Sequence, residues 1–327
     1  MKLTCITTTF NEGNALYTSV NSVLSQTYEN FEYLIVDDGS SDETLELLEG
    51  LKDPRIKILS QANDGLSSAR NRALEHTTGD YVCFLDADDC RPNWSFQAIA
   101  DTIKASDPDV LLCAGVLSDV RGELNAFYDK KCFDMLADIC PEGSVNKADA
   151  TAKWAWPLAQ WIEPQSANKV IRTEFLKSRM IGFPNTHFFE DIYFHSNVVA
   201  AAQTLAFLRT PSFTYFRRYS RPQITGTATD KRFDIIAVTK LTLESFARYV
   251  EFHDPLHRAS VIASCLKLVE WCESTIGHHH RYNYQQAVKG MLKLVDPLYL
   301  AFPSDIPTEL PELKRAQSYL KRITDAA

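Results

Sequence analysis

The sequence predicts an α/β fold with a mostly parallel, Rossmann-like sheet, helices on both faces and a helical C-terminal region. Two observations carry this prediction. Within residues 1–115, strand-like apolar segments alternate with segments of helical periodicity, which is the pattern of βαβ units. One segment, 81–85, is apolar at every position, as expected of a parallel strand buried on both faces.

The remaining elements are predicted in chain order. Strands are expected at residues 2–9, 31–36, 55–59, 81–85 and 109–114. Helices are expected at residues 15–26, 40–51, 65–75, 92–104, 190–202, 231–252, 256–276, 281–296 and 309–324, and another follows the segment 167–172. Ser40 and Glu43 have the spacing of a capping box, and Pro92 suits the first turn of a helix. Residues 116–164 have no regular pattern and are expected to be irregular. We therefore predict a first domain over 1–228, made of 1–115 and 116–228, and a helical region over 229–327.

Composition limits the classes of function. The chain has 327 residues, of which 45% are hydrophobic and 23% charged, so it can bury a substantial core. A net charge of -8 argues against a nucleic-acid-binding protein. No apolar run is long enough to span a membrane, and the N-terminus enters a strand directly, without the layout of a signal peptide. The eight cysteines form no Cys-x-x-Cys pair, which argues against a disulfide framework and against a zinc site. The cysteines therefore favour a protein of the reducing cytoplasm.

Three carboxylates, Asp86, Asp88 and Asp89, follow the buried strand 81–85 directly. Ligands of parallel sheets bind outside the carboxyl ends of the strands, so this position suits a binding site. In extended backbone the side chains of Asp86 and Asp88 point the same way. Two such oxygen ligands suit a divalent cation that also binds phosphates, although a solvated acidic turn is the alternative.

The glycine pattern excludes two common nucleotide sites. Neither Gly-x-Gly-x-x-Gly nor Gly-x-x-x-x-Gly-Lys-Ser/Thr occurs in the sequence. A nucleotide would therefore be held by a metal ion and acidic groups.

Five segments together resemble the family 2 glycosyltransferases. They are residues 7–11 (Thr-Thr-Thr-Phe-Asn), 22–27 (Ser-Val-Leu-Ser-Gln-Thr), 37–40 (Asp-Asp-Gly-Ser), 69–71 (Ala-Arg-Asn) and 86–89 (Asp-Ala-Asp-Asp). The resemblance covers residues 2–115 and, less closely, 165–225. It implies the GT-A fold, a nucleotide-sugar donor and inversion at the anomeric carbon.

The resemblance assigns roles to single positions of the donor site. These are Thr8 and Phe10 in the base pocket, Asp38 on the imide of a base that is most often uracil, Arg70 near the donor, and Asp86 and Asp88 in the metal motif. Asp88 is expected to bind Mn²⁺ or Mg²⁺ directly. Arg70 has an alternative role, which is to pair with a carboxylate and hold its helix. Asn71 has a similar alternative, which is to cap or brace that helix.

The resemblance places the general base in the pair Glu190–Asp191, with Asp191 taking the proton of the acceptor hydroxyl. The alternative is two acids that stabilise a helix N-terminus. His187 and His195 are candidates for contacts with the acceptor, and the alternative for each is a structural role. A basic segment contains Arg217, Arg218 and Arg221. In the family, the corresponding segment closes over the diphosphate, whose oxygens arginine can bind. The alternative is a solvated basic loop.

The sequence therefore predicts a metal-dependent inverting hexosyl- or N-acetylhexosaminyltransferase with a UDP-sugar donor. The expected acceptor is a glycan or lipid-linked glycan in bacterial surface polysaccharide assembly. The Gln-x-x-Arg-Trp signature of processive members is absent. The C-terminal helices are expected to brace the domain, form a homo-oligomer or contact the inner face of a membrane, since the last helix is basic. A nucleotidyltransferase and a non-catalytic nucleotide-sugar-binding scaffold are the alternatives.

Overall fold

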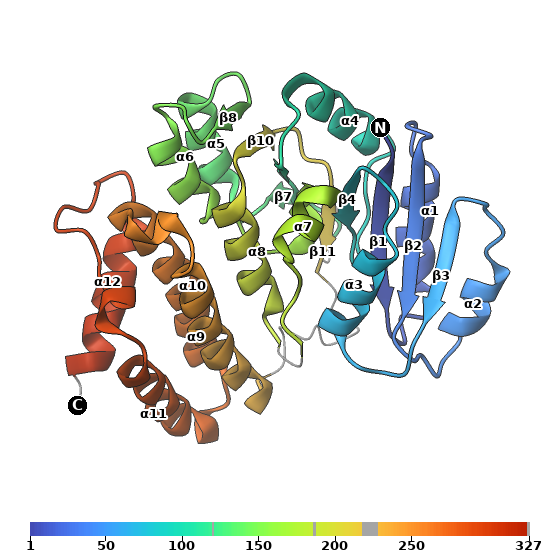
Figure 1. Ribbon diagram of the computed structural model, residues 1–327. Helices are drawn as coiled ribbons and strands as arrows, with labels where there is room; N and C mark the ends of the chain where they lie inside the picture. Colours follow the sequence, from blue (N-terminus) through green and yellow to red (C-terminus); the bar gives the residue numbers. More distant parts are fainter. Residues whose placement is uncertain (120, 186–187, 218–227, 326–327) are drawn as a thin grey trace. The chain divides into compact units, whose positions relative to one another are not determined.

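The computed structural model describes residues 1–119, 121–185, 188–217 and 228–325 (Figure 1). The chain divides into two compact units, each with its own packing. Unit 1 comprises residues 1–152, 165–186 and 202–219, and unit 2 comprises 153–164, 187–201 and 220–327. The boundary of the first domain at residue 228 stays a prediction.

Unit 1 contains an eight-stranded sheet. Its strand order is β3 (Ile56–Ser60), β2 (Phe31–Asp37), β1 (Leu3–Thr9), β4 (Tyr81–Phe84), β9 (Lys169–Arg172), β5 (Val110–Cys113), β10 (Thr204–Leu208) and β8 (Ser144–Asn146). The first four strands are parallel to one another, as are β5 and β10. Strand β9 runs antiparallel to both β4 and β5, and β8 runs antiparallel to β10. The carboxyl ends of six strands therefore lie along one edge, and the predicted, mostly parallel α/β sheet is confirmed.

Helices cover both faces of this sheet. Cys5, Tyr33 and Cys83 are neighbours in register on β1, β2 and β4, and they share one core cluster with apolar residues of α1 (Ala15–Leu24) and α4 (Ser95–Ser106). Helix α3 (Leu66–Glu75) contacts β1 and β2 and lies in front of the sheet in Figure 1, with α1 behind it. The alternation of side chains along each strand thus supplies an apolar surface to both helical layers.

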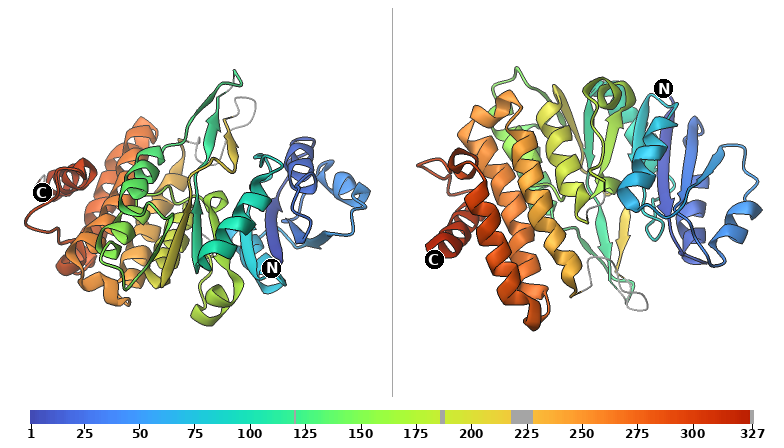
Figure 2. Two further views of the ribbon diagram at one scale, coloured as in Figure 1. Left: turned by 90° about the horizontal axis from the view of Figure 1, so that it is seen from above. Right: turned by 60° about the horizontal axis from the view of Figure 1, so that its bottom comes forward.

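A second, three-stranded sheet extends from unit 1 (Figure 2, left). Its order is β11 (Thr214–Phe216), β6 (Val116–Ser118) and β7 (Leu124–Ala126). The prediction that residues 116–164 are irregular is wrong, because this range contains β6, β7, α5 (Lys130–Ile139), β8 and α6 (Ala152–Ala159). Strands of three residues are too short for an alternating pattern to be recognised in the sequence.

Two predicted helix starts are also wrong. Helix α2 (Thr44–Gly50) begins after the proposed capping box, and the Ser40 hydroxyl instead accepts a hydrogen bond from the backbone N–H of Asn11 at 2.9 Å. Helix α4 begins at Ser95, three residues after Pro92. In both places the polar or proline residue shapes the turn before the helix.

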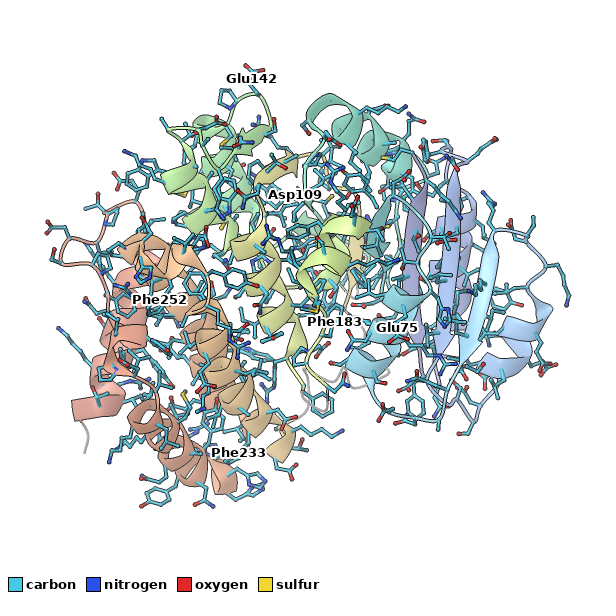
Figure 3. The ribbon with its side chains drawn as sticks, viewed as in Figure 1. Glu75, Asp109, Glu142, Phe183, Phe233 and Phe252 are labelled. Carbon is cyan, nitrogen blue, oxygen red and sulfur yellow. The ribbon has the colours of Figure 1, made fainter. Side chains whose placement is uncertain are left out.

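Unit 2 is helical, as predicted (Figure 2, right). Its main helices are α8 (Glu190–Ala201), α9 (Asp234–Phe246), α10 (Pro255–Thr275), α11 (His278–Leu294) and α12 (Pro311–Asp325). The carboxylate of Glu273 on α10 accepts hydrogen bonds from Gln285 on α11 and Tyr319 on α12, both at 2.7 Å. Phe233, labelled in Figure 3, packs edge-on against Tyr284. In the part of the chain that the structure describes, no helix has the length and hydropathy needed to cross a membrane.

One polar network closes the amino-terminal edge of the large sheet. The Glu32 carboxylate accepts hydrogen bonds from Lys2 Nζ at 2.8 Å, Thr4 Oγ1 at 2.6 Å and the Thr78 backbone N–H at 2.7 Å. Burial alone would raise the pKa of Glu32, but these donors outweigh burial and lower the pKa to about 2. The carboxylate is thus ionised in the folded protein down to acidic pH.

Candidate functional site

The acidic loop, which we define as residues 86–90, follows β4 at the carboxyl edge of the sheet. The backbone N–H of Asp89 bonds the carbonyl of Asp86 at 3.0 Å and closes a tight turn. The side chain of Asp89 is buried and accepts a hydrogen bond from the backbone N–H of Phe216 at 3.0 Å. Asp86 and Asp88 are only partly buried. The loop therefore separates one structural carboxylate from two that solvent reaches.

Strand β11 is fixed against this loop by its backbone. The Thr214 N–H donates to the Cys90 carbonyl at 2.8 Å, and the Cys90 N–H donates back to the Thr214 carbonyl at 3.3 Å. These bonds form an isolated antiparallel bridge between segments 124 positions apart in the sequence (214 minus 90). The side chains of β11 are thereby placed next to the acidic loop.

A buried arginine lies directly behind the loop. The Arg91 guanidinium donates hydrogen bonds to the carbonyls of Ala167 at 2.7 Å, Ser212 at 3.0 Å and Phe84 at 3.1 Å. Arg91 thus joins the end of β4, the segment before β9 and the segment before β11. Sequence reasoning missed this residue, because two of its three partners, Ala167 and Ser212, lie far from it along the chain.

Arg70 on α3 lies beside the metal motif, and its alternative role as an ion-pair partner describes its contact in the structure. Its Nη2 forms an ion pair with Asp86 Oδ1 at 3.0 Å, and its side chain is only 3% exposed. The guanidinium carbon lies 5.1 Å from the centre of the Phe183 ring, which is labelled in Figure 3. Arg70 therefore orients one of the two candidate metal ligands.

Asn71 braces the segment around Phe183 rather than capping its own helix. Its Nδ2 donates to the Phe183 carbonyl and its Oδ1 accepts from the Phe183 N–H, both at 2.8 Å. The same Nδ2 donates to Asn185 Oδ1 at 3.0 Å. This reciprocal pair holds the Phe183 ring where it packs against the Arg70 guanidinium.

Asp38 follows β2 at the same edge of the sheet and is 4% exposed. Its Oδ1 accepts hydrogen bonds from Gln61 Nε2 at 2.7 Å and the Asp64 N–H at 2.9 Å, and its Oδ2 accepts one from the Gly65 N–H at 2.9 Å. A carboxylate has about four lone-pair sites, so three donors leave one site for a ligand. Asp38 thus holds the 61–65 loop, which sequence reasoning did not anticipate. Its neighbour Asp37 is buried and accepts from the Ser40 N–H, which is a structural role.

Thr8 lies near the end of β1 and Phe10 directly follows the strand. Strand β1 lies between β2, which leads to Asp38, and β4, which leads to the acidic loop. Thr8 is partly buried, whereas Phe10 is 44% exposed, a large exposed fraction for an aromatic side chain. Asn11 follows with a φ of 54°. Its Oδ1 accepts a hydrogen bond from the Ser41 N–H at 2.7 Å, which ties the end of β1 to the turn after β2.

Tyr215 on β11 is a residue that the sequence prediction missed. Its ring packs edge-on against Phe127, with 6.1 Å between the ring centres. Burial, together with the negative charges of Asp89, Asp86 and Asp88, raises the pKa of the Tyr215 hydroxyl. The hydroxyl is therefore a neutral donor close to the acidic loop.

Arg217 follows β11, and its Nη2 donates a hydrogen bond to the hydroxyl of Tyr128. Its guanidinium carbon also lies 5.6 Å from the centre of the Tyr128 ring. The backbone N–H of Arg217 bonds the Ser118 carbonyl at 3.0 Å, which extends the pairing of β11 with β6. Arg218 and Arg221 lie outside the described residues.

The predicted general base belongs to unit 2, whereas the residues above belong to unit 1. Glu190 and Asp191 occupy the first turn of α8, where Glu190 is buried and Asp191 is partly exposed. His195, further along α8, is fully buried with Nε2 3.1 Å from the Ala159 carbonyl, which is the contact of a structural histidine. His187 lies outside the described residues.

The ligand set at the acidic loop fits a cation that is shared with a substrate. Among the described residues there is no group of three or more His, Cys, Asp or Glu side chains that could hold a metal ion. Two partly exposed carboxylates, Asp86 and Asp88, instead suit Mg²⁺ or Mn²⁺, which keep waters or take phosphate oxygens as further ligands. These two carboxylates could bind a cation together with phosphate oxygens, and Asp38 offers an acceptor at the end of β2, two strands away from β4.

Comparisons with known proteins find related sequences and a shared fold. Residues 4–136 match the sequence model of Glycosyl transferase family 2. An uncharacterised glycosyltransferase of Escherichia coli, YibD, is 32% identical over 142 residues, which are 36% of this chain and 41% of that protein. The chain thus spans less than half the length of this curated relative.

Two solved structures share the fold. The Staphylococcus aureus protein TarS (residues 1–349), in complex with UDP-GlcNAc, superposes with a TM-score of 0.73 and 19% identity over 99% of this chain and 89% of that chain. The mannosyltransferase PcManGT of Pyrobaculum calidifontis, in complex with GDP-Man and Mn²⁺, superposes with a TM-score of 0.51 and 17% identity over 99% and 88% of the two chains. The motifs and these comparisons agree: residues 4–136 resemble glycosyltransferase family 2, and the chain has the GT-A fold of these solved structures.

Proposed function

We propose that this chain is a metal-dependent inverting glycosyltransferase that moves a sugar from a UDP-sugar to an acceptor hydroxyl. The observation that carries the proposal is the gathering of Asp38, Asp86 and Asp88 at the carboxyl ends of β2 and β4 within unit 1. The structural neighbours bind UDP-GlcNAc in one case and GDP-Man with Mn²⁺ in the other, which supports a nucleotide-sugar donor.

In this proposal the residues of unit 1 bind and orient the donor. The acceptor site left on the Asp38 carboxylate takes the imide N–H of uracil, beside Thr8 and the exposed ring of Phe10. Asp88 and Asp86 hold the cation, and the ion pair with Arg70 keeps Asp86 in position. A bound Mn²⁺ or Mg²⁺ supplies charge stabilisation to the departing diphosphate. Arg217 and Arg218 contribute further positive charge to the diphosphate.

Asp191 is the proposed general base. It takes the proton from the acceptor hydroxyl as that oxygen attacks the anomeric carbon on the face opposite the diphosphate. One displacement of this kind inverts the configuration at that carbon and needs a single base. The proposed acceptor is a glycan or lipid-linked glycan of a bacterial surface, a proposal that rests on the family resemblance.

Calorimetric titration with UDP, GDP, CDP and dTDP, each with and without Mn²⁺, tests the donor site. We expect Mn²⁺-dependent binding of UDP by the wild type, loss of that binding in Asp88→Ala, and retention in the control Asp101→Ala, whose carboxylate is exposed on α4. Asp191→Asn should bind UDP as the wild type does but lose sugar transfer.

Each other outcome has a definite meaning. Preference for GDP would keep the transferase and overturn the assignment of uracil to Asp38. Binding that is unchanged in Asp88→Ala would remove the proposed metal site. Failure of the wild type to bind any of the four nucleotides in the presence of Mn²⁺ would overturn the proposed function.

A further inference from the structure

We infer that Tyr215 is a further donor-site residue, whose hydroxyl donates a hydrogen bond to a diphosphate oxygen of the nucleotide bound at the acidic loop. The inference rests on the proposed function, which it extends to a residue on a different sheet. None of the motifs in the first half of the chain includes this residue.

The backbone fixes where Tyr215 stands. On one side, Thr214 forms the two-bond bridge with Cys90, and on the other side the Phe216 N–H bonds the carboxylate of Asp89. Both neighbours of Tyr215 are thus tied to the acidic loop. Its distance from the loop therefore depends on three hydrogen bonds and not on a free loop end.

The side chain is anchored at its ring. Phe127 packs edge-on against both Tyr215 and Phe213, with centre-to-centre distances of 6.1 Å and 5.4 Å. The hydroxyl makes no hydrogen bond to any residue in the part of the chain that the structure describes. A partly buried phenol normally finds a partner for its hydroxyl, so this group is available to a ligand.

The chemistry of the ligand follows from the surroundings. The loop that carries Asp86, Asp88 and Asp89 is hydrogen-bonded to the residues on both sides of Tyr215. A phenol keeps its proton at neutral pH. An anionic diphosphate beside these carboxylates needs donors as well as a cation. A neutral phenol supplies a donor without an added charge, and Arg217, two positions along the chain, supplies a positive charge on the same segment.

The test compares Tyr215→Phe with the wild type and with Tyr282→Phe, a control in which the tyrosine is 69% exposed on α11. The change removes only the hydroxyl and leaves the ring on Phe127. Two quantities are measured for each protein, the Kd for UDP in saturating Mn²⁺ and the melting temperature without ligand. We expect the Kd of Tyr215→Phe to rise about tenfold, the usual effect of losing one hydrogen bond to a charged group, with an unchanged melting temperature.

Two results would overturn the inference while leaving the proposed function intact. An unchanged Kd in Tyr215→Phe would mean that the hydroxyl does not contact the diphosphate. A raised Kd accompanied by a lower ligand-free melting temperature would assign Tyr215 to the folding of unit 1 instead. Absence of UDP binding by the wild type would overturn both the inference and the function on which it rests.

Discussion

Replacing Arg91 with methionine should destabilise unit 1 behind the acidic loop, because the guanidinium joins three chain segments by hydrogen bonds alone. It donates to the carbonyls of Phe84, Ala167 and Ser212 and is 2% exposed. Methionine fills a similar length of the cavity with apolar atoms but donates nothing. The change therefore isolates the hydrogen bonds from the packing.

The loss can be estimated from the partners. The Ser212 carbonyl keeps a second donor, the Ser95 hydroxyl at 2.9 Å, so the Phe84 and Ala167 carbonyls are the two affected. A buried acceptor left unsatisfied costs about 1–3 kcal/mol, so two cost about 2–6 kcal/mol. Removing a buried guanidinium also relieves its desolvation, which offsets part of this loss. We expect the free energy of unfolding of unit 1 to fall by about 2–4 kcal/mol.

Hydrogen exchange of the β4 and β5 amides measures this change for unit 1 alone. The matched control is Arg179→Met, an exposed arginine on α7 (Thr173–Arg179) of the same unit, which should stay within about 0.5 kcal/mol of the wild type. The Kd for UDP with Mn²⁺ should also rise in Arg91→Met, since Ser212 leads into β11 beside the acidic loop. A loss of less than about 1 kcal/mol in Arg91→Met would refute the argument that these hydrogen bonds hold the segments together.

Two further changes test the turn after β2 and the edge network. Gly39→Ala should destabilise unit 1 by at least about 1–2 kcal/mol and weaken UDP binding, because the φ of Gly39 is 79° and a Cβ would lie 2.7 Å from the Asn63 backbone nitrogen. Urea unfolding would measure the stability, and titration would measure the Kd for UDP. Wild-type values of both would contradict the close fit. Glu32→Gln should lower stability at neutral pH, because the folded-state pKa of Glu32, about 2, lies below its ordinary 4.5. The stability that this carboxylate contributes is present above about pH 4.5 and is lost as the pH falls toward 2. The melting temperature of Glu32→Gln should therefore depend less on pH between these values than the melting temperature of the wild type. Parallel curves of melting temperature against pH would disprove the assignment.

The positions of the candidate donor-site residues in the sheet could be predicted from local sequence. The candidate site residues stand within a few positions of a strand end, as Asp38 follows β2 and Asp86 follows β4. A parallel arrangement then brings these ends together without knowledge of any long-range contact. The sequence could not reveal that Asp38 also holds the 61–65 loop, because backbone donors leave no signature in side-chain identity.

The other side of the acidic loop could not be predicted in this way. Tyr215 and Arg91 are placed by contacts that include partners more than 70 positions away, and β11 has only three residues. Short strands carry no periodic signal, and a tyrosine between two other polar or aromatic residues is common in surface strands. Their roles became visible only through the bridge between Thr214 and Cys90.

Strand β9 explains why the second half of the sheet was harder to predict than the first. It pairs antiparallel with both β4 and β5, so the parallel strands form two groups, β3-β2-β1-β4 and β5-β10. The first group is built from consecutive βαβ units, whose order follows from the chain itself. The second group joins β5 to β10 across 90 intervening residues, from 114 to 203, that include β6 and β7 of the small sheet. Nothing in a four-residue segment such as Lys169–Arg172 specifies its direction, because so short a segment carries no pattern that distinguishes a parallel from an antiparallel strand. Tyr215 follows β10 in the chain, on β11 of the small sheet. Its proposed contact with the donor therefore depends on the structure and on the binding experiments above.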